Sequence, residues 1–174
     1  MIELLILDAI SKREFTMYGI QKHIEEHFRA FTKPSFGALK PALNRLEEKE
    51  CLSVRRMMSD GGRLSGYYSI TSKGKNELGK RLLLETSENP LQFMSDARIK
   101  LALAGHLNQD ERKKMFFHLK SRALQHKNKA EITLNDSYTP LTFYEKIVLD
   151  SALCEYSNLI TIIEGFEKDN ARNS

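Results

Sequence analysis

The sequence predicts a mainly α-helical fold with one small β-hairpin, in which a winged helix-turn-helix head is followed by a C-terminal helical dimerisation arm. Three short stretches with apolar residues at helical spacing come first, and a strand–turn–strand pattern follows them. Long amphipathic stretches fill the second half. Helix, helix, helix, hairpin is the order of a winged helix. The expected domains are residues 1–85, the head, and residues 86–174, the arm.

Each of the three head helices is predicted by apolar residues that recur every three or four positions. Thr16 and Ser35 stand directly before the second and third patterns, where a hydroxyl group caps a helix. The apolar stripes comprise Ile2, Leu5, Ile6, Ala9 and Ile10 in the first helix, Tyr18, Ile20, Ile24 and Phe28 in the second, and Phe36, Leu39, Leu43 and Leu46 in the third. The third helix is expected from Ser35 to Lys49, with Pro41 tolerated inside it because Gly37 lies four residues before.

A β-hairpin is predicted after Glu50. Strand-like residues 52–58 and 67–70 flank a turn at 59–62 that contains two glycines. Thr71 then suits the cap of a fourth helix, Lys73 to Leu84, and residues 86–89 have the composition of a linker.

The second half predicts three further helices. The first begins at Pro90, a residue that suits the first position of a helix, and carries Leu91 on its apolar stripe. The second begins at Asp110 and Glu111, because acidic residues are favourable at a helix N-terminus. The third covers about residues 142–166. The apolar faces are too wide for solvent, so a second copy of the chain is the expected cover. The residues expected at that dimer interface are Phe116, Leu119, Val148, Leu159, Ile163 and Phe166.

Composition indicates an ordinary globular protein, with 41% hydrophobic and 29% charged residues. The net charge of +4 comes from the first 85 residues, which have 15 Lys and Arg against 11 Asp and Glu, whereas the rest has 12 of each. No signal peptide or membrane-spanning stretch is recognised, which favours a cytoplasmic protein. Cys51 and Cys154 form no metal or disulfide pattern and are interpreted as buried thiols.

The candidate site is the polar face of the third helix, because the second helix of a helix-turn-helix pair lies in the DNA major groove. Lys40, Asn44 and Arg45 fall opposite the apolar stripe. Asn pairs with adenine, and Lys or Arg pairs with guanine or phosphate. Lys33 and Ser35 suit phosphate contacts. Arg63 at the hairpin tip suits a minor groove or backbone contact, and Tyr67 on the returning strand joins the expected DNA-binding set.

These residues also carry a resemblance to the PadR-like family of bacterial transcriptional regulators. The matching motifs are Tyr18-Gly19-Ile20, residues 35–47, Gly61-Gly62-Arg63, residues 67–71 and Lys73-Gly74. The second half is similar to the longer members related to the virulence-gene activator branch. The resemblance implies a homodimer that binds palindromic promoter DNA as a sequence-specific regulator, and it implies a small aromatic effector in some members.

The sequence also departs from the family pattern. Lys40 stands where the family usually has Tyr, and Glu50 replaces a Gly that would tolerate a left-handed helix cap. Glu50 should therefore strain the turn or force another helix ending. Ser65-Gly66 occupy wing positions that are often basic.

Several alternatives stay open. A winged-helix module that binds a protein and little DNA is the second hypothesis, since the fold alone does not decide function. The arm aromatics Phe116, Phe117, Phe143 and Tyr144 line an effector pocket in one interpretation and form core in the favoured one. His23 and His27 have metal-ligand spacing without a third ligand, so no metal or other cofactor is expected. No nucleophile elbow or positioned base is present, so we expect no enzyme.

Overall fold

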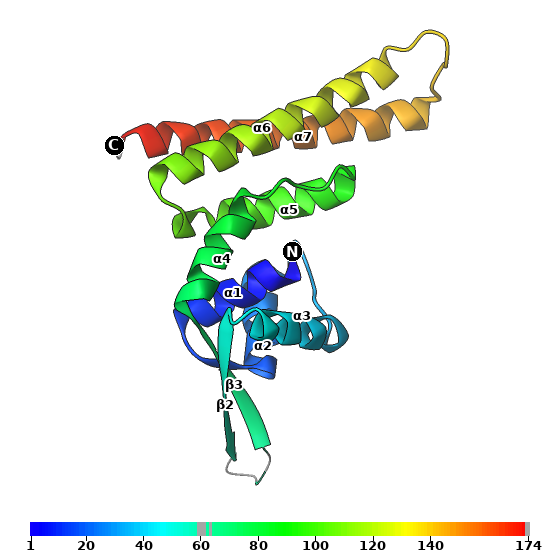
Figure 1. Cartoon of the computed structure of the whole chain (residues 1–174). Helices are drawn as coiled ribbons and strands as arrows, with labels where there is room; N and C mark the ends of the chain where they lie inside the picture. The colour runs from blue at the N-terminus through cyan, green and yellow to red at the C-terminus, as the bar shows by residue number, and fades with distance from the viewer. Residues whose placement is uncertain (59–61, 63, 173–174) are drawn as a thin grey trace. The chain divides into compact units, whose positions relative to one another are not determined.

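The computed structural model describes residues 1–58, 62 and 64–172, coloured along the chain in Figure 1. The chain forms two compact units. The head unit comprises Met1–Leu84 with Met94–Leu107, and the arm unit comprises Glu85–Phe93 with the chain from Asn108 onward. Within the described residues, no helix is both long enough and apolar enough to cross a membrane.

Four helices of the head match the predicted patterns: α1 (Ile2–Lys12), α2 (Met17–Phe28), α3 (Phe36–Glu48) and α4 (Ser72–Leu83). Thr16 and Ser35 cap α2 and α3, their hydroxyl oxygens accepting hydrogen bonds from Gly19 N at 3.1 Å and Ala38 N at 3.3 Å. Thr71 caps α4 in the same way, from Gly74 N at 3.0 Å. The three predicted caps are confirmed, and α3 continues through Pro41.

The hairpin belongs to a three-stranded antiparallel sheet. Its strands are β2 (Leu52–Met58) and β3 (Leu64–Ile70), and β1 (Phe15–Thr16) pairs with the other edge of β3. A strand of two residues is too short to show the alternation that predicts strands, so the sequence did not reveal β1. The structure thereby joins the start of α2 to the base of the hairpin.

The core of the head is built around α1, which packs against α2, α3 and α4. Every residue from Glu3 to Ile10 is buried, whereas the sequence predicted a single apolar stripe. A helix surrounded by three others has no solvent face along this stretch, so two acidic side chains, Glu3 and Asp8, are buried with the apolar ones. Both acids pair with cations, as buried charges require.

The end of α3 confirms the expected conflict at Glu50. Its φ of 56° is left-handed, a conformation that a side chain makes costly. Cys51 N donates to Leu46 O and Glu50 N donates to Glu47 O, each at 2.8 Å. These two hydrogen bonds form a Schellman ending with Glu at the position glycine usually takes.

The helices after the head begin with α5 (Pro90–Ala102), and the division between the two units falls inside it. The 3-10 turn η1 (Ala104–His106) follows, then α6 (Gln109–Leu134) and α7 (Phe143–Arg172). α6 and α7 lie side by side as a long helical hairpin in Figure 1. Asn108 and Glu111 form a capping box at the start of α6, and α7 continues six residues beyond the predicted end at Phe166.

Four residues expected to be buried are exposed: Tyr18, Phe36, Leu91 and Cys154. Phe36 is the first residue of α3, where the helix end projects past the core that covers Leu39. Cys154 lies at an exposed position of α7, whereas Cys51 is buried as predicted.

Candidate nucleic-acid interface

The exposed face of α3 carries Lys40 and Asn44, one helical turn apart. The opposite face buries Leu39, Leu43 and Leu46 almost completely. Because α3 is anchored to the head through its apolar face, its polar face is held toward solvent. The amide of Asn44 can donate and accept hydrogen bonds, and the ammonium of Lys40 can only donate.

Lys33 and Ser35 lie at the entrance to α3, and both are exposed. Gln21 on α2 supports this entrance, because its side-chain nitrogen donates to the carbonyl oxygen of Pro34 at 3.3 Å. The Ser35 oxygen accepts from the backbone of α3, which leaves its hydroxyl proton available as a donor. A lysine and a hydroxyl at a helix N-terminus form a setting suited to an anion.

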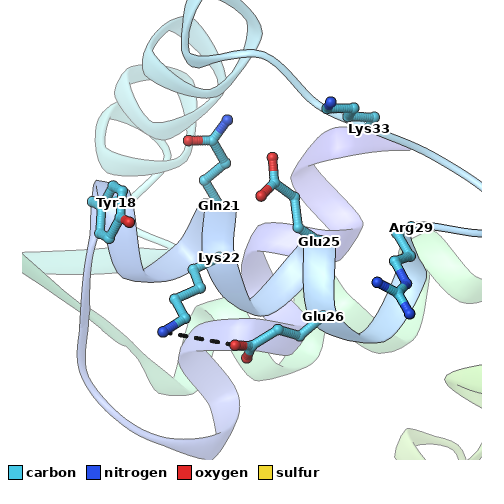
Figure 2. Close-up of a pocket in the computed structure, with 7 residues that line it drawn as sticks. All are labelled: Tyr18, Gln21, Lys22, Glu25, Glu26, Arg29 and Lys33. Carbon is cyan, nitrogen blue, oxygen red and sulfur yellow. Dashed lines mark ion pairs between the residues drawn. The ribbon is translucent and has the colours of Figure 1, made fainter.

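A groove of about 460 Å³ runs along the outer face of α2. Figure 2 shows the residues that line it, with Lys33 on the segment that connects α2 to α3. The groove contains both signs of charge: Lys22 pairs with Glu26 at 3.8 Å, and Glu25, Arg29 and Lys33 line the remainder. This mixed charge makes the groove a weaker anion-binding surface than the entrance of α3.

Tyr18 and Phe36 form an exposed aromatic pair that the sequence patterns had assigned to the apolar stripes. Their ring centroids lie 6.5 Å apart at an interplanar angle of 18°, and Tyr18 is 67% exposed. The pair joins the first turns of α2 and α3. The sequence could have indicated this exposure, because both residues fall in the first turn of their predicted helices, and such residues often lie beyond the core.

Arg45, predicted beside Asn44, is held by the head itself. Its Nε donates to Glu3 Oε1 at 2.6 Å, and Arg81 of α4 pairs with the other Glu3 oxygen at 2.6 Å. Burial by itself would raise the pKa of Glu3, but the hydrogen bond from Arg45 and the charge of Arg81 hold it below its ordinary value. Sequence patterns could not show this pairing, because Glu3 and Arg45 are 42 positions apart.

On the hairpin, Arg55 is paired as well. Its guanidinium bonds Glu14 at 2.6 Å and lies 5.5 Å from the ring centre of Tyr67. Tyr67 is only partly exposed and sits in β3 opposite Arg55. Arg56, the next residue of β2, is exposed. The predicted contact residue Arg63 lies outside the described residues.

The predicted dimerisation residues fall into two groups in the arm. Four are buried within one chain, chiefly by packing of α6 on α7: Phe116, Leu119, Leu159 and Ile163. Val148 is 69% exposed and Phe166 is partly exposed. Among the aromatics weighed for an effector pocket, Phe116 is core, whereas Phe117, Phe143 and Tyr144 are exposed.

A second polar cluster surrounds the buried carboxylate of Asp8. His106 Nε2 lies 2.8 Å from one oxygen and Lys12 Nζ lies 3.1 Å from the other. His23 Nε2 lies 3.3 Å from the Lys12 ammonium, and its ring lies 4.3 Å from that of His27 at an interplanar angle of 45°. Across the described residues, no three His, Cys, Asp or Glu side chains lie where they could share a metal ion.

The head is also the part of the chain that matches a known family. Residues 6–80 match the model of the transcriptional regulator PadR-like family, and this stretch runs from α1 through the sheet to α4. The head belongs to the PadR-like family. PadR-like proteins are transcriptional regulators and not enzymes, so the exposed polar residues of α3 lie in a regulator and not in a catalyst.

Three solved structures align with this chain over most of its length. PadR of Bacillus subtilis in complex with operator DNA is 19% identical, covering 95% of this chain and 97% of its own, with a TM-score of 0.45. A protein of Streptococcus mutans is 23% identical, covering 94% and 96%, with a TM-score of 0.46. A PadR-like regulator of Bacillus cereus is 19% identical and covers both chains fully, with a TM-score of 0.43. No curated protein matches the chain.

Proposed function

We propose that this PadR-like protein is a sequence-specific DNA-binding regulator that acts as a homodimer on palindromic promoter DNA. The observation that carries the proposal is the two-sided α3, with Leu39 and Leu43 buried and Lys40 and Asn44 exposed. An α-helix of this kind fits the major groove, where base edges differ in their donors and acceptors.

Each exposed residue has a distinct part in this proposal. Asn44 reads adenine through its amide, and Lys40 donates to guanine or to phosphate. Lys33 and Ser35 contact the backbone at the N-terminus of α3, which sets the register of the helix. Arg56 places positive charge on the hairpin, where a wing meets the adjacent backbone or minor groove, and Arg63 stays a contact that the sequence alone predicts.

Dimerisation is inferred from the arm. The first turns of α7 expose Phe143, Tyr144, Ile147 and Val148, and a shallow hollow of about 350 Å³ lies among Leu141, Tyr144 and Val148. Contiguous exposed apolar surface of this kind marks an interaction site. A second copy is the cover we propose, because an isologous pair of arms buries the same patch on both chains. A twofold dimer would bring two α3 helices to symmetric half-sites, which is why the operator is expected to be palindromic.

The test is a fluorescence-anisotropy titration of the protein with duplexes from its own promoter region at several salt concentrations. Binding should weaken steeply with salt, because each phosphate contact releases counterions. Asn44→Ala should weaken binding to the specific duplex about 10-fold or more and leave binding to random duplex nearly unchanged. Asn76→Ala, an exposed Asn on α4, is the matched control and should alter neither.

Two results would reject the proposal. The first is the absence of salt-dependent binding to every duplex tested. The second is an equal loss on all duplexes for Asn44→Ala, which would show that this residue does not read bases. The alternative, a winged-helix module for a protein partner, is favoured by the pairing of Arg45 and Arg55 with carboxylates, and it predicts a head that ignores both DNA and heparin.

A small aromatic effector is also part of the proposal. A cavity of about 400 Å³ in the head unit is lined by Asp8, Lys12, His27 and His106 with Phe28 and Leu103. The ammonium of Lys12, the ring nitrogens of the two histidines and the ring of Phe28 together suit an aromatic acid, which would compete with Asp8 for the ammonium. A bound acid should raise the melting temperature in proportion to ligand concentration, whereas the matched amide should not. Equal shifts for acid and amide, or none for either, would count against an acid site.

A further inference from the structure

We propose that Glu3 is a positioning residue for operator recognition: it holds Arg45 of α3 against α1 and α4, so that Arg45 fixes the recognition helix and does not read DNA. This role rests on the proposed function, because it assumes that α3 enters the major groove. It reassigns Arg45, whose place on α3 predicts a DNA contact.

Both oxygens of Glu3 are engaged. Oε1 accepts from Arg45 Nε at 2.6 Å, and Oε2 lies 2.6 Å from Arg81 Nη2. Arg81 in turn pairs with Glu77 of α4, with Nε and Oε1 2.8 Å apart. Glu3 is 8% exposed, so it connects three helices from a nearly buried position. Charge-assisted hydrogen bonds in such a site are shorter and more directional than neutral ones.

The pairing sets the direction of the Arg45 side chain. A guanidinium whose Nε is bonded to a buried carboxylate has its plane fixed by that bond, because the group is rigid and flat. Here the carboxylate comes from α1, on the side of α3 that faces the body of the head. Arg45 therefore reaches back toward the head from the edge of the exposed face.

The Arg45–Glu3 hydrogen bond gives α3 a directional contact, which its apolar contacts do not provide. Leu39, Leu43 and Leu46 hold the helix by burial, and the hydrophobic effect is not directional. The Arg45–Glu3 bond restricts rotation and sliding of α3 at the residue next to Asn44. A recognition side chain must lie within about 0.5 Å of its productive position, so loss of this bond should reduce discrimination between bases.

The experiment is a double-mutant cycle on DNA binding with Glu3→Gln, Arg45→Met and the pair together. Each single variant should weaken binding to the specific duplex about 5- to 30-fold, and the double variant should be no weaker than either single one. Binding to random duplex and the slope of affinity against salt should remain as in the wild type, because no phosphate contact is lost. Arg45→Met keeps the Glu3–Arg81 pair, so this variant stays informative if Glu3→Gln folds poorly.

Arg45→Lys separates the two roles of this residue. A lysine keeps the charge that a phosphate contact needs but replaces the flat guanidinium, whose Nε bonds Glu3, with a freely rotating ammonium, so it should bind the specific duplex less tightly than the wild type. The positioning role is overturned if Arg45→Met lowers the salt slope by about one phosphate, if Lys restores wild-type binding, or if Glu3→Gln behaves as the wild type. If the wild-type protein binds no duplex, the proposed function fails first and this role fails with it.

Discussion

Gly74 lies against the carbonyl oxygen of Cys51 so closely that a Cβ on this glycine would be 1.9 Å from that oxygen. The contact joins the first turn of α4 to the start of β2, and Thr71 N bonds the same carbonyl at 3.2 Å. A glycine is therefore required here for space. The Lys73-Gly74 motif that carries part of the family resemblance has this close approach as its physical reason.

Gly74→Ala should destabilise the head by about 3 kcal/mol, because backbone must move to admit the methyl group. Urea denaturation followed by circular dichroism measures this. Gly79→Ala in the same helix is the control, since the nearest atom to its added Cβ is 3.9 Å away, and it should stabilise by about 0.5–1 kcal/mol. Equal effects of the two changes would contradict the steric explanation.

Glu50→Gly should raise the free energy of unfolding by about 1 kcal/mol, because it relieves a left-handed residue at the end of α3. The change also removes the ion pair with Lys73 at 2.8 Å, but both side chains are exposed and such pairs contribute little. Glu50→Ala loses the same pair and keeps the Cβ, so it should not stabilise. If Ala and Gly gave the same result, backbone strain would not be the cause.

His126 should make the arm sensitive to acid. Its ring contacts the rings of Phe93 and Tyr156, at centroid distances of 5.0 and 5.6 Å, and among the described residues its buried Nε2 has no hydrogen-bond partner. Burial, with the nearby charges of Lys129 and Arg122, lowers the pKa of His126 below its ordinary 6.5. The unfolded chain therefore binds a proton at His126 more readily than the folded chain does. The contribution of the neutral His126 ring to the free energy of unfolding is fully present above about pH 6.5, and it is lost as the pH falls through the lower pKa of the folded state.

His126→Phe removes this titration and keeps an aromatic ring in the stack. The free energy of unfolding of the variant should therefore fall less than that of the wild type between pH 7.5 and 5.5. His118→Phe, at an exposed position of the same helix, should follow the wild type. A wild-type arm as stable at pH 5.5 as at 7.5 would show that His126 is not the acid-sensitive group.

Val148→Asp should weaken dimerisation at least about 10-fold, because it places a charge in the apolar patch that we expect a second chain to cover. Sedimentation velocity over a range of concentrations measures the dimer population. Leu64→Asp changes a side chain of the hairpin that is similarly exposed, and it should leave the dimer intact. A dimer that tolerates Val148→Asp would place the interface elsewhere.

Sequence patterns that span a few residues predicted the helices and caps of the head well. They did not predict the ion pairs between residues that are far apart in the sequence. Thr16, Ser35 and Thr71 cap their helices as expected, because a cap depends on residues three positions away. The strain at Glu50 was predictable for the same reason. The bonds of Arg45 to Glu3 and of Arg55 to Glu14 were not, since each joins residues more than 40 positions apart. Helical periodicity places Arg45 on an exposed face, and the strand pattern places Arg55 on the hairpin, but neither pattern shows which carboxylate reaches the arginine.

The position of Glu3 has a practical consequence for handling the protein. Its carboxylate contacts Arg45 from the first turn of α1. A purification tag fused ahead of α1 would therefore place foreign charge beside the contact that orients α3. Affinity measurements on such a fusion would mix the properties of the tag with those of the operator, so tag-free protein is the appropriate material.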